Sequence, residues 1–138
     1  MSDGPLPDSP AARWYRLAEE DLAAAHALLH ADDIVPRIAC FLSQQAAEKA
    51  LKAGLIAIGR QFPKSHGLTR LLGTFPEERR PTIDEDDLDA LDPWVIDGRY
   101  AADLPPVSSA EAVVIAGIAE RVVEAVRPFV LEHRSSTG

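Results

Sequence analysis

The stretch RIACFLSQQAAEKALKAGLIAI, residues Arg37–Ile58, decides the fold class because it contains no proline and reads as one helix. On a helical wheel at about 100° per residue, one face of this helix carries aliphatic and polar side chains together: Ile38, Leu42, Gln45, Lys49, Lys52 and Ile56. Phe41 and Leu55 border this face, and Glu48 lies at its edge. We expect the face to be an apolar stripe that packs in the core, interrupted by its three polar residues.

The two lysines of this stripe need a partner, because burying an unpaired ammonium group costs several kcal/mol. If the first two helices pack antiparallel, Asp21 can pair with Lys49 or Lys52 across the interface and fix the helix register. The alternative is that the polar residues line a cleft for an anionic ligand such as a nucleotide or RNA. Glu48 and Lys52 also stand four residues apart, in the order that stabilises a helix.

Length and composition indicate one globular domain. The chain has 138 residues, of which 46% are hydrophobic and 26% are charged, and this is ordinary for a soluble protein. Its formal net charge of −8 repels nucleic acid and anionic membranes, so any nucleotide or RNA binding needs a local basic patch. No apolar run approaches the roughly 20 residues of a membrane span.

The beginning of the chain and its cysteine content indicate a cytoplasmic protein. MSDGPLPDSP lacks the basic start and apolar core of a signal peptide. Cys40 is the single cysteine, which excludes an intrachain disulfide framework and fits a reducing compartment. We expect this thiol to be inert, because no histidine stands at helical spacing from it.

The chain is predicted to be all-α, an up-and-down helical bundle of four main helices plus one or two short helices. We expect a flexible segment over residues 1–8, one helical domain over residues 9–133 and a flexible tail over residues 134–138. The first helix starts at Ser9-Pro10, with the serine as its cap, and runs to about His30. Its predicted inner face consists of Trp14, Leu17, Ala18, Leu22, Ala25, Leu28 and Leu29, with Asp21 among them.

The second half of the chain gives weaker helix signals. A short helix carries Leu68, Leu71 and Leu72, and residues 75–82 are expected to form a loop. Another helix starts at about Asp84, is kinked or restarted at Asp92-Pro93, and ends near Gly98. Ser108 and Glu111 form a capping-box pattern that opens a last helix, which runs to about Arg127 before Pro128 ends or kinks it.

No cofactor or metal is predicted. His26 and His30 have the spacing of two metal ligands on one helix, but they point away from the apolar stripe and no third ligand follows. A solvated histidine pair is therefore expected. The sequence also contains no glycine-rich phosphate loop, no GxSxG and no CxxC motif.

Four pieces of the chain together resemble the HEPN family (higher eukaryotes and prokaryotes nucleotide-binding). Residues 41–53, FLSQQAAEKALKA, resemble the signature helix of that family. Residues 18–25 resemble its first helix, and residues 63–68, PKSHGL, resemble its P-x-x-H-x-L turn. Arg99-Tyr100 stands before the last helix, where the family has Arg-Tyr-Pro. The resemblance covers about residues 12–127.

The resemblance implies a small helical bundle that usually forms a dimer. Members of the family act as ribonucleases, as toxins or as partners of small nucleotidyltransferases. Catalytic members use an Arg-x(4–6)-His motif near the last helix, in which arginine would stabilise the phosphate in the transition state and histidine would move the 2′-hydroxyl proton. Here Ala101 replaces the expected proline, and residues 101–107 contain no histidine. The spacing occurs elsewhere, at Arg60–His66 and at Arg127–His133.

Three functions follow as hypotheses. The leading one is a homodimeric HEPN module that works with a nucleotidyltransferase-type partner in a toxin–antitoxin-like system. Its cleft for a nucleotide, RNA or the partner would be lined by Gln45, Glu48, Lys49, Lys52, Arg99 and Tyr100. For Arg99 and Tyr100 there is an alternative: Arg99 pairs with an acid such as Asp21 or Glu48, and Tyr100 packs on the bundle. The second function is a metal-independent endoribonuclease that uses His66 with Arg60 or Arg99. The third is a purely structural interaction module.

Overall fold

The computed structural model describes residues 6–31, 35–62, 67–95 and 105–132. Three long helices form its body: α1 (Pro10–Leu29), α2 (Pro36–Ala57) and α5 (Ser109–Glu132). Two short helices, α3 (Leu68–Thr74) and α4 (Glu85–Leu91), lie along one side of the body, with 3₁₀ turns η1 (Glu77–Arg79) and η2 (Asp92–Trp94) following them. Within the described ranges no strand is present, so the predicted all-α bundle is confirmed.

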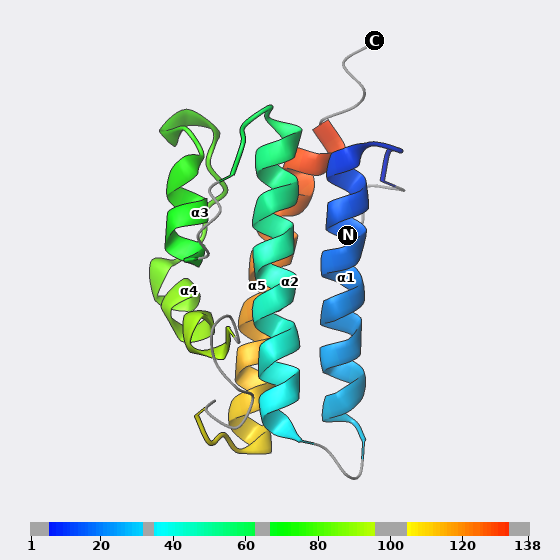
Figure 1. The fold of residues 1–138 in the computed structure, drawn as a ribbon, viewed down its shortest axis with the longest axis vertical. Helices are drawn as coiled ribbons and strands as arrows, with labels where there is room; N and C mark the ends of the chain where they lie inside the picture. Colours follow the sequence, from blue (N-terminus) through cyan, green and yellow to red (C-terminus); the bar gives the residue numbers. More distant parts are fainter. Residues whose placement is uncertain (1–5, 32–34, 63–66, 96–104, 133–138) are drawn as a thin grey trace.

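Helix α2 is the central element of the bundle. It packs side by side with α1, while α5 lies behind both and contacts both (Figure 1). Helices α3 and α4 pack against another side of α2 and α5. In the region that was expected to hold a fourth main helix, the described residues form the seven-residue α4 and the turn η2. None of the described helices is long and apolar enough to cross a bilayer.

The helix starts predicted from the sequence are confirmed at both ends of the chain. The backbone N–H of Ala12 donates to Oγ of Ser9 at 3.0 Å, which satisfies one of the free N–H groups of the first turn of α1. At α5, the N–H of Glu111 donates to Oγ of Ser108 (3.1 Å) and the N–H of Ser108 donates to the Glu111 carboxylate (3.0 Å). This reciprocal pair is a capping box, and it lowers the pKa of Glu111.

Of the end or kink expected at Pro128, the end is excluded, because α5 continues to Glu132. A proline inside a helix removes one backbone hydrogen bond and costs about 3 kcal/mol. Packing of the next turn opposes this cost: Val130 is fully buried, and the Phe129 ring meets Phe75 edge to face at 5.7 Å. The hydroxyl of Tyr15 also donates to the backbone carbonyl of Val123 at 2.7 Å and ties α1 to the preceding turn of α5.

The helix expected to end near Gly98 ends earlier. Helix α4 stops at Leu91, η2 follows to Trp94, and Val95 has extended backbone angles. The side chain of Asp92 accepts a hydrogen bond from the N–H of Leu68 at the start of α3 (3.3 Å), and Trp94 is buried against Cys40. These two anchors hold the chain in η2 and direct it away from the axis of α4.

Candidate functional site

The predicted polar cluster lies on α2, at the edge of the core and not in its centre. The buried side of α2 is formed mainly by small residues: Ala39, Cys40, Ser43, Ala46, Ala47, Ala50, Ala53, Gly54 and Ala57. The centre of this group of small residues is about 125° around the helix from the predicted stripe. Of the six stripe residues, five are only partly buried and Lys52 alone is buried. The stripe therefore lies at the edge of the core: Lys52 is buried and Ile56 packs against core residues, whereas the other four residues are partly exposed. Alanine and glycine on the buried side let α1 and α5 approach α2 closely.

A matching row on α1 continues this surface. Trp14, Leu17, Asp21 and Leu28 stand at helical spacings on the flank of α1 that adjoins α2, and Leu17 is 44% exposed. Leu17 had been expected in the core, where Tyr15 is found instead. We name the combined surface the α1/α2 outer face: Trp14, Leu17, Asp21, Leu28, Ile38, Leu42, Gln45, Lys49, Lys52 and Ile56.

Asp21 pairs with Lys49 on this face. The Lys49 ammonium donates to the Asp21 carboxylate at 2.6 Å, and about three quarters of each side chain is shielded from solvent. Of the two lysines considered for Asp21 from the sequence, Lys49 is its partner among the described residues. The antiparallel packing of α1 against α2 brings these residues together, and the ion pair joins the two helices.

Lys52 is held by a chain of side-chain hydrogen bonds that runs along α2. Its ammonium donates to Glu48 at 2.9 Å, and the Glu48 carboxylate also accepts from Gln44 at 3.3 Å. Gln45 donates in turn to the carbonyl oxygen of Gln44 at 2.8 Å. The Glu48–Lys52 spacing was recognised in the sequence, but here both residues are buried, where the desolvated charges depend on each other more strongly than at a surface.

Two aromatic rings complete the surroundings of Lys52. Its Nζ lies 5.7 Å from the centre of the Trp14 ring and 5.1 Å from that of Phe62, and the two rings meet edge to face at 5.8 Å. Sequence reasoning missed this aromatic contact because Phe62 follows α2 without any periodic signal, and Trp14 belongs to a different helix. The contacts join α1, α2 and the segment that follows α2.

The candidates for ribonuclease chemistry are not assembled within the described residues. Arg60 is exposed at the end of α2. His66, Arg99 and Tyr100 lie outside the described ranges, as does His133, so their predicted roles stay predictions. Gln45, Glu48, Lys49 and Lys52 do lie together, and each lysine already has a carboxylate partner.

The histidine pair of α1 is engaged with neighbouring groups. His26 lies 3.0 Å from Glu120 of α5, and Nδ1 of His30 lies 2.7 Å from the backbone carbonyl of His26. In the part of the chain that the structure describes, no three histidine, cysteine or acidic side chains gather as a metal site. Cys40 is fully buried, and burial raises the pKa of its thiol to about 11.

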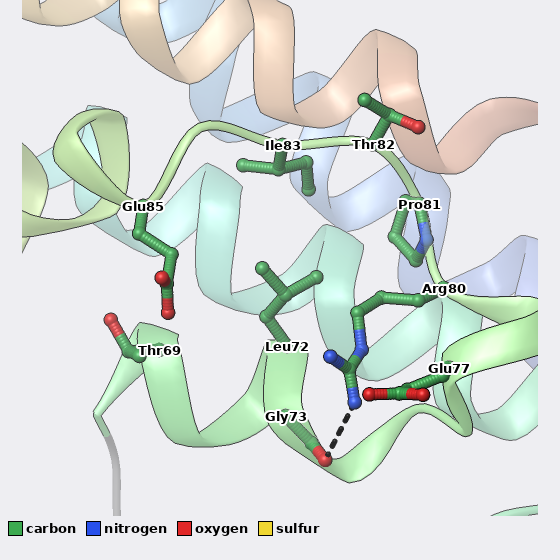
Figure 2. A pocket seen from close by; sticks show the side chains of 9 residues that line it. All are labelled: Thr69, Leu72, Gly73, Glu77, Arg80, Pro81, Thr82, Ile83 and Glu85. Carbon is green, nitrogen blue, oxygen red and sulfur yellow. Dashed lines mark hydrogen bonds between the residues drawn. The ribbon is translucent and has the colours of Figure 1, made fainter.

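Two pockets lie elsewhere in the described part of the molecule. One pocket of about 380 Å³ lies between α3, the η1 turn and the segment that leads into α4 (Figure 2). Its polar lining comes from Thr69, Glu77, Arg80 and Glu85, and Arg80 is tied to the backbone carbonyls of Gly73 and Phe75. A second pocket, of about 350 Å³, lies on the other side of the same segment, next to Arg121. No predicted site residue lines either pocket.

Comparisons with known proteins agree with this architecture. The family model described as HEPN domain matches residues 11–129. The fold is similar to the crystal structure of TT1696 from Thermus thermophilus, with 30% sequence identity and a TM-score of 0.70 over 86% of this chain and 97% of that one. It is also similar to ST0689, an archaeal HEPN homologue, with 25% identity and a TM-score of 0.63 over 88% and 98% of the two chains. A comparison with curated proteins gave no match.

Proposed function

This chain belongs to the HEPN domain family, and we propose from that premise that it is a homodimeric HEPN module that acts through protein contacts. Its partner would be a nucleotidyltransferase-type protein in a toxin–antitoxin-like system, as the resemblance to the family implies. In this proposal the α1/α2 outer face is a protein-binding surface, and the polar residues within it set the geometry of the contact.

The observation that carries the proposal is the pairing of both lysines on this face. Lys49 is bound to Asp21 at 2.6 Å and Lys52 to Glu48 at 2.9 Å. Each ammonium group is already neutralised by a carboxylate, which weakens its attraction for a phosphate group, and the net charge of −8 also works against anion binding. Aliphatic side chains stand beside the pairs and remain partly exposed, which favours contact with another protein.

Three measurements on the full-length protein test the proposal. Light scattering after size exclusion measures the oligomeric state. Titration calorimetry at low salt measures whether the protein binds ATP. Incubation with a 5′-labelled single-stranded RNA shows whether the protein cleaves RNA. We expect a dimer, no saturable ATP binding and no cleavage. Co-expression with a nucleotidyltransferase-type protein from the same genome should give a stable complex, and Leu42→Glu on the outer face should alter its stoichiometry or affinity.

The opposite results would identify the other functions. RNA cleavage that His66→Ala abolishes, with helical content unchanged, would establish a ribonuclease. Saturable ATP or RNA binding that is lost in the double variant Lys49→Ala/Arg99→Ala would show that the polar residues form a ligand cleft. A monomer that binds no nucleotidyltransferase-type protein would overturn the proposed dimeric module.

A further inference from the structure

The pocket between α3 and the segment that leads into α4 has polar groups at both ends and apolar groups between them (Figure 2). Four polar side chains line it, two at each end: Thr69 and Glu85, then Glu77 and Arg80. The side chains of Leu72 and Ile83 lie between the two ends. The volume of about 380 Å³ is within the range of roughly 300–1,000 Å³ that small-molecule sites occupy. The pocket is therefore large enough for a small ligand or for one long side chain of another protein.

One end of the pocket holds two acceptor groups that have no partner. The hydroxyl oxygen of Thr69 is buried and makes no hydrogen bond with any described residue. Figure 2 shows this hydroxyl and the Glu85 carboxylate pointing toward each other across the end of the pocket, and no hydrogen bond joins them. A buried hydroxyl without a partner is unfavourable, because it has given up its hydrogen bonds to water. A donor placed between the two groups would satisfy both.

The guanidinium group of the pocket does not supply that donor. Nε and Nη2 of Arg80 donate to the backbone carbonyl of Phe75 at 3.2 and 2.7 Å, and Nη2 also donates to the carbonyl of Gly73 at 3.4 Å. These bonds hold the guanidinium at the end of the pocket that also contains Glu77 (Figure 2). Glu85 at the other end therefore faces the pocket without a cation among the described residues.

The charge around the Thr69–Glu85 end favours a cationic ligand. Residues 81–92 contain six acidic side chains and no basic one. Arg121 approaches this segment from α5, but it is bound to Asp87 at 3.1 Å on the other side of the segment. The negative potential of these carboxylates attracts cations and repels phosphate and carboxylate groups. The chain as a whole, with its net charge of −8, acts in the same direction.

A primary ammonium group has the donors that this end of the pocket lacks. It carries three N–H donors and no acceptor, so it can donate to the Glu85 carboxylate and to the Thr69 hydroxyl at the same time. We infer that the pocket binds a primary ammonium group on an aliphatic chain, with the nitrogen between Thr69 and Glu85 and the chain along Leu72 and Ile83. A free alkylamine or a lysine side chain of another protein supplies this chemistry. The site shares no residue with the α1/α2 outer face, so the inference is independent of the proposed function.

Titration of the intact chain with butylamine tests the site. In ¹H–¹⁵N correlation spectra at low salt we expect saturable shifts, largest at the amides of Thr69, Gly73 and Ile83. Glu85→Gln should weaken the affinity by about tenfold, because it removes the charged acceptor, and Thr69→Val by about threefold. The matched control is Asp86→Asn, which removes the same charge from the same helical turn at a residue that does not line the pocket. It should change the dissociation constant by no more than about twofold.

Two further probes separate the parts of the inference. Butan-1-ol has the same chain without the charge and should cause no saturable shifts. Nα-acetyl-lysine methylamide tests the source of the ammonium group: tighter binding than butylamine would assign the pocket to a lysine of a partner protein, and weaker binding would assign it to a free amine. The spectra of the variants also show whether each one is folded, and Glu85→Gln changes an exposed residue.

Three results would overturn the inference. The first is that neither amine gives saturable shifts. The second is that Glu85→Gln and Asp86→Asn weaken butylamine binding equally, which would show general attraction of cations to an acidic surface. The third is that butan-1-ol binds as tightly as butylamine, which would show a purely apolar contact.

Discussion

The ammonium group of Lys49 lies 2.6 Å from the carboxylate of Asp21, although the two residues are 28 positions apart in the sequence. The bond joins α2 to α1 at the middle of their antiparallel contact. It also neutralises a lysine that would otherwise attract anions to the outer face. One ion pair therefore bears on the fold, on the register of the first two helices and on the kind of partner that this surface accepts.

Removing one member of this pair should destabilise the protein more than removing both. Lys49→Met leaves Asp21 without its lysine in a partly desolvated position, and we expect the free energy of unfolding to fall by about 1–2 kcal/mol. The double variant Asp21→Leu/Lys49→Met should recover most of this loss.

Urea denaturation measures the free energy of unfolding of both variants. Arg121→Ala, which breaks the more exposed pair with Asp87, serves as the control and should cost less than about 1 kcal/mol. A double variant no more stable than Lys49→Met would contradict the argument.

Lys52 should matter more for stability than its i,i+4 ion pair alone would suggest. Lys52→Met removes the buried bond to Glu48 and the cation near the rings of Trp14 and Phe62. We expect a loss of about 2 kcal/mol in urea denaturation. In a Trp94→Phe background Trp14 is the remaining tryptophan, so its emission should also change in the Lys52→Met variant. Unchanged stability and unchanged emission would show that the aromatic contact carries no energy.

Local signals were sufficient for the elements of this fold. Ser9 and Ser108 indicate helix starts because a cap depends on residues only three positions away, and both caps are present. The sequence left open whether α5 ends or is kinked at Pro128, because this proline is a local signal, whereas the burial of Val130 beyond it is a tertiary effect.

The candidate site could be predicted only in part. The wheel correctly grouped Gln45, Lys49 and Lys52 on one face, but it assigned that face to the core. On a helical wheel, large aliphatic residues dominate the hydrophobic pattern. The contacts of α2 with α1 and α5 depend instead on small residues, which contribute little to that pattern. The contact of Phe62 with Lys52 could not be predicted, because no sequence signal indicates the path of the chain after α2.

Glycine at position 54 illustrates how closely α2 is packed. A methyl group there would lie 2.9 Å from Cζ of Phe75 and 3.0 Å from Cγ1 of Val126. Gly54→Ala should therefore lower the free energy of unfolding by about 1–3 kcal/mol, although alanine favours helix more than glycine does. Gly117→Ala on α5 is the matched control, because a methyl group there meets no atom within 4 Å. It should stabilise the protein by up to about 1 kcal/mol, and a stabilising Gly54→Ala would show that the packing can relax.

Stability should fall in mildly alkaline solution because two buried acids resist ionisation. Burial raises the pKa of Cys40 from 9.0 to about 11, with a smaller contribution from the negative charge of Glu111, and burial also raises the pKa of Tyr15. Above about pH 9 the unfolded thiol loses its proton while the folded thiol keeps it, so the stabilisation present below pH 9 is lost as the pH rises to 11. We expect the loss attributable to Cys40 to be roughly 1–3 kcal/mol.

Urea denaturation at pH 8, 9, 10 and 11 measures this loss of stability. Cys40→Ala should flatten the decline in stability between pH 9 and 11. Tyr15→Phe should flatten only the further decline above pH 10. An identical alkaline slope in the wild type and in Cys40→Ala would refute the assignment to this thiol.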